Sequence, residues 1–212
     1  MERTGVDAEG ATGGTGVGDA LGTTDLAVVR YRLAPGEGFP SGLHAHLDQE
    51  EVFVVLAGEA VFEVLPPAAD WPESSAESPG DAESPSGARP RGREVTVAAS
   101  EAVRFAPGEF QTGRNPASAD RDLVALALGA PKETDDVRIP ARCPGCGAPA
   151  LRLGTGGDAF TLDCSECESS FDPGPCPDCG SPDLAMGLDA DRHPVSRCAD
   201  CESEHETAPL VH

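Results

Sequence analysis

Hydrophobic and polar side chains alternate along several short segments of the chain. Residues 26–33 divide into two alternating sets, which is the period of two that a β-strand produces. Residues 51–56 and 59–65 flank Gly58 and predict two strands joined by a tight turn. Shorter apolar runs predict further strands at residues 95–98, 103–105 and 123–128. No segment carries a 3.6-residue stripe, so the pattern predicts a mainly β domain, a small barrel or sandwich.

Other segments lack any such pattern. Residues 1–24 are rich in Gly and Thr and are expected to be a disordered tail. Residues 66–94 contain six prolines and predict a disordered insertion between two strands of the barrel, a passive loop or a lid. The expected organisation is therefore a tail at 1–24, a barrel at 25–130, a linker at 131–142 and a cysteine-rich region at 143–212.

Composition narrows the class of protein. Apolar residues make up 39% of the 212 residues and aromatic residues 4%, so any core must be modest. The longest apolar run has eight residues, whereas a membrane helix needs about 20. Residues 1–24 also lack the pattern of a signal peptide, so we expect no membrane partner and a cytoplasmic location.

The charge is strongly negative. The chain has 15 basic and 37 acidic residues, a formal net charge of −22, and its one lysine is Lys132. This acidic composition resembles that of proteins from extremely halophilic archaea, where molar salt screens the self-repulsion. A surface of this charge disfavours contact with nucleic acid phosphates, so we expect no nucleic acid partner.

The first candidate site contains His44, His46 and Glu51. The two histidines are two positions apart, so on a strand both imidazoles point to one face. Glu51 opens the next strand, and if its face is the barrel interior the three side chains converge there. Two imidazoles and a carboxylate suit a divalent transition metal with coordination positions left open. The alternative is three unrelated polar residues near a turn.

The spacing of Gly38, His44, His46, Glu51 and Gly58 resembles the first motif of the cupin superfamily, and the resemblance covers residues 25–130. The second motif is less complete, because its five positions fall on Ser100, Ala106, Gly108, Gln111 and Asn115. The resemblance implies a cupin β-barrel, or double-stranded β-helix, with a bound metal and a possible homodimer. It also places Gln111 where a fourth, histidine ligand is expected, so Gln111 is a tentative ligand. Fe, Mn, Ni and Zn all remain open as the barrel metal.

Three functions fit this reading. The first is a metal-dependent oxygenase or isomerase acting on an unidentified small molecule, with no catalytic acid or base assigned. The second is a non-catalytic ligand-binding or sensory cupin, and the third is an interaction scaffold with an empty barrel. Arg30, Arg104 and Arg114 could bind a carboxylate, but strand parity places Arg30 and Arg104 opposite the predicted interior, so these arginines are expected at the surface.

All eight cysteines fall in four CxxC pairs, and the pairs repeat after 33 or 34 residues. This pattern resembles a tandem zinc ribbon and implies two structural zinc ions. One set is Cys143, Cys146, Cys164 and Cys167, and the other is Cys176, Cys179, Cys198 and Cys201. Disulfides, a redox pair and an iron–sulfur cluster are the alternatives. From residue 143 onward three arginines face thirteen acidic residues, so a protein partner or a purely structural role is expected rather than nucleic acid binding.

Overall fold

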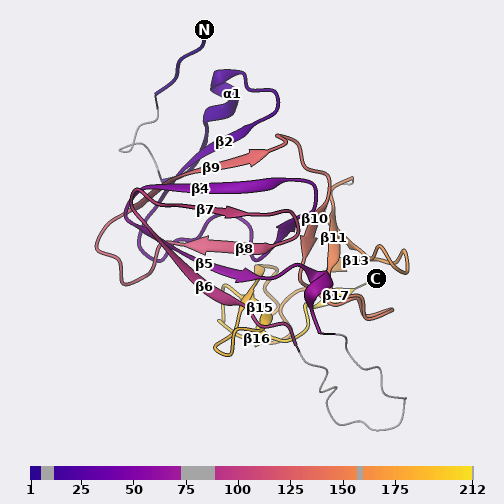
Figure 1. Ribbon diagram of the computed structural model, residues 1–212. Coiled ribbons are helices and arrows are strands. Elements are labelled where there is room, and N and C mark those ends of the chain that lie inside the picture. The colour runs from indigo at the N-terminus through magenta and orange to yellow at the C-terminus, as the bar shows by residue number, and fades with distance from the viewer. Residues whose placement is uncertain (6–11, 73–88, 157–159, 212) are drawn as a thin grey trace, which may run out of the picture.

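The computed structural model describes residues 1–5, 12–72, 89–156 and 160–211. A barrel of two facing antiparallel sheets forms the first part of the chain, and two four-cysteine modules lie beside it (Figure 1). The predicted fold class, a mainly β protein with a barrel followed by two four-cysteine ribbons, is confirmed.

The barrel sheets are built from strands that lie far apart in the sequence. One sheet has the order β1-β2-β9-β4-β7, with bounds Gly13–Gly16, Ala27–Leu33, Leu123–Ala130, Glu50–Ala57 and Ala102–Phe105. The other has the order β6-β5-β8, with bounds Arg93–Ala98, Glu59–Leu65 and Phe110–Arg114. All six predicted strands are present, and β1 and β8 are additional. The turn between β4 and β5 has Gly58 at φ 77°, a conformation that glycine adopts at low cost.

The barrel core lies between the two sheets, where alternating residues of each strand meet. It is rich in phenylalanine, and Phe62 is fully buried among Phe53, Phe105 and partly buried Phe39. Tyr31 packs against this cluster with its ring edge-on to Phe39 at 5.1 Å. These contacts confirm that the odd-numbered positions of β2 face the interior, as the alternation predicted.

The expected disordered tail differs from the structure over its second half. Strand β1 pairs with the edge of β2, and helix α1 (Val17–Leu21) follows it, with Val17 buried. The reason is that Gly- and Thr-rich segments still offer backbone N–H and C=O groups, which an open strand edge can pair. Residues 6–11 lie outside the described residues.

The ends of the predicted insertion are also ordered. A short 3₁₀ helix, η1 (Ala68–Asp70), follows β5, and the Trp71 indole donates a hydrogen bond to the carbonyl of Pro66 at 2.8 Å. The Trp71 ring packs against Phe110, with 5.3 Å between ring centroids. Partial burial of this one aromatic side chain orders a segment whose proline content predicted no regular structure. The middle of the insertion, residues 73–88, lies outside the described residues.

The cysteine-rich region continues the sheet structure. The first module belongs to a sheet of order β17-β13-β12-β11-β10-β3, with bounds Leu210–Val211, Ser170–Pro173, Thr161–Asp163, Leu151–Gly154, Val137–Ile139 and Ala45–His46. The second module forms the sheet β14-β15-β16, with bounds Leu184–Leu188, Pro194–Cys198 and Glu204–His205. The expected linker at 131–142 therefore contains a strand, because β10 pairs with β3 of the barrel on one side and with β11 on the other.

The second module also contacts the barrel directly. The Leu43 N–H donates to the carbonyl of Met186 at 2.7 Å, and the Leu188 N–H donates to the Glu63 carboxylate at 2.9 Å. A Cβ on Gly42 would lie 2.7 Å from the Met186 carbonyl oxygen, so only glycine allows this approach. Leu43, Leu188 and neighbouring side chains from all three parts share one buried cluster. Barrel and modules thus form one continuous body.

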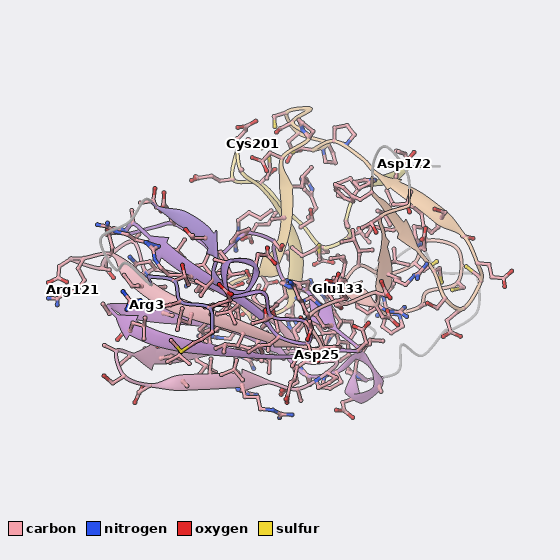
Figure 2. All side chains as sticks on the ribbon, turned by 90° about the horizontal axis from the view of Figure 1, so that it is seen from above. Arg3, Asp25, Arg121, Glu133, Asp172 and Cys201 are labelled. Carbon is pink, nitrogen blue, oxygen red and sulfur yellow. The ribbon has the colours of Figure 1, made fainter. Side chains whose placement is uncertain are left out.

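Figure 2 shows the modules beside the barrel strands, with Asp172 of the first module and Cys201 of the second on the side away from Asp25. Within the described residues, no helix combines the length and apolar character that crossing a membrane would require.

Candidate metal centre

Three of the predicted ligand residues come together inside the barrel. His44, His46 and Glu51 each place a potential ligand atom within 4.8 Å of the other two. His46 Nε2 lies 3.7 Å from Glu51 Oε2, and the two imidazole rings stand edge to face with centroids 5.0 Å apart. The strands explain this geometry, because His46 belongs to β3 and Glu51 is the second residue of β4.

Both histidines are oriented by hydrogen bonds at Nδ1. His44 Nδ1–H donates to the carbonyl oxygen of Gly42 at 2.8 Å. His46 Nδ1 lies 3.1 Å from the hydroxyl of Thr134, which donates to the Asp48 carboxylate at 2.6 Å. Because the hydroxyl hydrogen is directed to Asp48, the same oxygen accepts from His46. Each imidazole therefore keeps a lone pair on Nε2, as a metal ligand requires.

Gln111 lies beside the three ligands but makes a different contact. Its amide nitrogen donates to Glu51 Oε2 at 2.8 Å, and the residue is buried. Backbone hydrogen bonds in both directions join Gln111 to His44 and hold β8 against the ligand segment. In this arrangement Gln111 orients the Glu51 carboxylate, and its tentative role as a ligand stays a prediction.

Burial shifts the proton affinities in this cluster. Desolvation raises the pKa of Glu51 to about 7, and the hydrogen bond from Gln111 opposes that rise. Desolvation, followed by the neighbouring His44, lowers the pKa of His46 to about 4, and burial also lowers the pKa of His44. Two neutral imidazoles beside a carboxylate form a donor set that fits a divalent transition metal.

The ligands line a cavity of about 210 Å³ inside the barrel. Its other walls include Tyr31, Phe39, Phe53 and Thr112, and no Lys or Arg is among the described residues that line it. Burial and the Glu51 carboxylate raise the pKa of the Tyr31 phenol. Tyr31 is a further ionisable group that sequence reasoning did not assign to the site, although its strand parity pointed inward.

The three arginines lie outside this cavity. Arg104 pairs with Glu50 at 2.7 Å on the exposed face of its strand, and Arg114 pairs with Glu63 and Glu94. Arg30 lies on the face opposite Tyr31, as expected, but it is only 3% exposed, so its surface assignment is wrong. The cause is the N-terminal segment, in which β1 and α1 pack on β2.

The eight cysteines form the two predicted groups of four. In each group the first cysteine of every CxxC pair is buried and the second is exposed. Neighbouring sulfurs are 3.5 to 3.7 Å apart, for example between Cys146 and Cys164 and between Cys143 and Cys167. Four sulfurs at about 2.3 Å from a tetrahedral ion lie about 3.8 Å apart, whereas a disulfide brings two sulfurs to about 2.05 Å. Both groups therefore fit zinc ribbons rather than disulfides.

The second group has a neighbouring histidine that the sequence reasoning did not assign. His205 Nε2 lies 3.7 Å from Cys176 Sγ and 3.7 Å from an Asp178 carboxylate oxygen. The Ser203 hydroxyl oxygen lies 3.4 Å from Cys176 Sγ, 3.2 Å from His205 Nε2 and 3.0 Å from Cys201 Sγ. In the metal-free protein, the hydrogen bond from Ser203 lowers the pKa of the Cys176 thiol to about 5.

The sequence matches no protein-family model and no curated protein. Solved structures that align with the chain include a cupin protein from Bacteroides fragilis, at 17% identity over 61% of this chain and 84% of that one, with a TM-score of 0.42. A sugar phosphate isomerase of the cupin superfamily from Silicibacter pomeroyi aligns at 18% identity over 85% of this chain and 82% of that one, with a TM-score of 0.39. An L-ribose isomerase from Cellulomonas parahominis aligns at 18% identity over 60% and 57%, with a TM-score of 0.37.

Proposed function

We propose that the chain is a cupin-type, metal-dependent enzyme that acts on a small molecule inside the barrel. The supporting observation is the arrangement of His44, His46 and Glu51, whose ligand atoms converge while both Nδ1 atoms are held by hydrogen bonds. Fe, Mn or Ni is the proposed barrel metal, and zinc is proposed for the two four-cysteine groups. Reduced cysteines in these groups fit the cytoplasmic location expected from the sequence.

The donor set defines the class of substrate. A divalent ion with two neutral imidazoles and one carboxylate keeps about one positive charge, and it would supply a Lewis acid for an anionic or enolisable oxygen. The cavity volume of about 210 Å³ admits only a small substrate. Phe39 and Phe53 give the cavity an apolar wall, and Tyr31 offers a hydroxyl near Glu51. Oxygenation and isomerisation are the two reactions that this proposal includes.

A second candidate is ligand binding without turnover, as in a sensory cupin. One observation favours it: beyond the three ligands, Tyr31 is the one ionisable side chain among the described residues that line the cavity. Its raised pKa makes it a poor base at neutral pH. Saturable binding with no oxygen uptake and no isomerisation would favour this second function.

Element-resolved metal analysis of the full chain, purified without a tag in molar KCl, tests the proposal. We expect zinc near two per chain and about one further Fe, Mn or Ni. His44→Ala should lose only the further metal, and His193→Ala, which changes a histidine outside the cavity, should keep it. Zinc alone in the wild type, with no change in His44→Ala, would remove the basis for a metal-dependent enzyme. If the third metal is present, oxygen uptake and isomerisation assays then separate the two candidates.

A further inference from the structure

A second cavity lies outside the barrel, where the segment before His44 meets both four-cysteine modules. Its volume is about 240 Å³. One wall is barrel residues 41–44, a second comes from β10 to β12 of the first module, and a third comes from β14 of the second module. Residues 208–210 close it from the end of the chain. The cavity therefore exists only when the barrel and both modules are assembled.

The lining of this cavity is apolar to an unusual degree for this chain. Charged residues make up 25% of the sequence, yet none of the nineteen described residues that line the cavity is Asp, Glu, Lys or Arg. Ile139, Leu153 and Met186 are only partly buried there, and Phe160 is 54% exposed. Partly exposed apolar side chains that converge on one hollow, in a chain with a net charge of −22, are a feature of binding sites.

The polar groups of the lining are few and uncharged. Ser41 and Ser196 contribute hydroxyl groups. His44 also lines the cavity, but its Nδ1 is already bonded to Gly42, and its Nε2 faces Gln111 in the barrel site. A charged ligand would lose its hydration here without gaining a partner charge, whereas a hydrocarbon or aromatic ligand would not.

We infer that this cavity binds a neutral, mainly hydrocarbon small molecule of the size of a one- or two-ring aromatic. A dry apolar cavity of about 150 Å³ holds benzene, and drug-sized ligands occupy about 300 Å³ or more, so 240 Å³ corresponds to a ligand between these sizes. The volume is too small for a peptide segment. The site is separate from the barrel cavity but adjoins it, because Ser41 and His44 belong to the walls of both.

The methionines of this chain provide a specific NMR probe of ligand binding in this cavity. The chain has two methionines, of which Met186 lines the cavity and Met1 is fully exposed. With methyl-¹³C methionine in the full, zinc-loaded chain, indole serves as the neutral probe. We expect its ring current to shift the Met186 methyl signal saturably while the Met1 signal stays constant. Benzoate and benzylammonium, which are similar in size but charged, should leave the Met186 signal unchanged.

Substitutions in the cavity wall test whether indole binds inside this cavity. Ala208→Trp fills the cavity and should weaken indole binding at least tenfold, whereas Ala190→Trp adds the same side chain at an exposed position outside the lining and should leave it unchanged. Should Ala208→Trp fail to fold, Phe160→Ser removes an exposed lining side chain and should weaken binding several-fold.

The inference would be overturned by the absence of a saturable shift with indole, by an equal shift at Met1, or by full binding in Ala208→Trp and Phe160→Ser. A Met186 signal that moves with protein concentration instead of indole would also overturn it, because the hollow would then be a contact between copies. None of these outcomes depends on the barrel metal, so the result is independent of the proposed function.

Discussion

Replacing Thr134 by valine should weaken the barrel metal site, although Thr134 is not a ligand. Valine keeps the shape of the side chain but removes the hydroxyl that accepts from His46 Nδ1 at 3.1 Å and donates to Asp48 at 2.6 Å. The His46 side chain is 12% exposed, so water replaces the lost acceptor poorly. The variant therefore leaves the imidazole free to rotate or to take the wrong tautomer.

The size of the effect follows from these two hydrogen bonds. An unsatisfied buried donor costs about 1–3 kcal/mol. Bound metal makes the imidazole N–H a stronger donor, so most of the loss falls on the metal-loaded state. Hydrogen-bond partners of metal-bound histidines typically contribute about 10–100-fold in affinity, or about 1.4–2.7 kcal/mol. We expect a loss within that range for Thr134→Val and little loss for Thr134→Ser.

Calorimetric titration with Mn²⁺ measures this effect, because thiolate groups that hold zinc compete poorly for manganese. Thr161→Val is the matched control, since the Thr161 hydroxyl also donates to an aspartate, Asp163 at 2.9 Å, in the first module. An affinity of Thr134→Val within about threefold of both the wild type and this control would refute the reasoning about His46.

Three further predictions concern stability. Phe62→Ala empties a fully buried position of the barrel core and should lower the free energy of unfolding by about 3–5 kcal/mol, measured by urea denaturation. Asn115→Ala removes the buried side-chain amide that donates to the carbonyls of Leu33 and Arg121, and should lower it by about 1–3 kcal/mol in the same assay, whereas an exposed change such as Ala190→Ser should not. In the metal-free protein the folded-state pKa of Glu51 is about 7, above its ordinary 4.5. The contribution of Glu51 to the free energy of unfolding is therefore lost as the pH rises from about 4.5 to 7. The stability of Glu51→Gln relative to wild type should therefore increase from about pH 4.5 to 7 and level off above, and a difference that does not change with pH would contradict the shift.

Side-chain alternation predicted the central strands of the barrel well, because their two faces have different surroundings. Strand β5 has the predicted bounds, β2 begins one residue later than predicted, and β4 extends one residue further at each end. Strand β8 was missed because Gln111, Thr112 and Gly113 interrupt any apolar pattern. Strand β1 carries almost no side-chain signal, and its order comes from backbone pairing with β2. Periodicity detects burial, so it does not detect strands that are held mainly by backbone hydrogen bonds.

The candidate sites likewise divide into residues that the sequence identified and contacts that only the structure shows. The short spacing within each CxxC pair, and between His44 and His46, was sufficient to identify these residues as metal ligands. Metal ligands often come in such closely spaced pairs, which a sequence shows directly. The hydrogen bond from His46 to Thr134 joins positions 88 residues apart, and no local pattern marks it. The second cavity is likewise not predictable from the sequence, because the sequence pattern presents residues 131–142 as a linker and the two modules as a separate region.

The four-cysteine modules stabilise the geometry of the barrel site through the backbone. On one side of His44, Leu43 donates its N–H to Met186 of the second module. On the other side, β3 pairs with β10, which leads into the first module. Within the barrel, this ligand segment is held by the pairing of His44 with Gln111. Undocking either module would break these hydrogen bonds and expose the segment to water, at a net cost of about 0.5–1.5 kcal/mol for each bond. The positions of both histidines therefore depend on the folding of modules that the sequence alone presents as a separate C-terminal region.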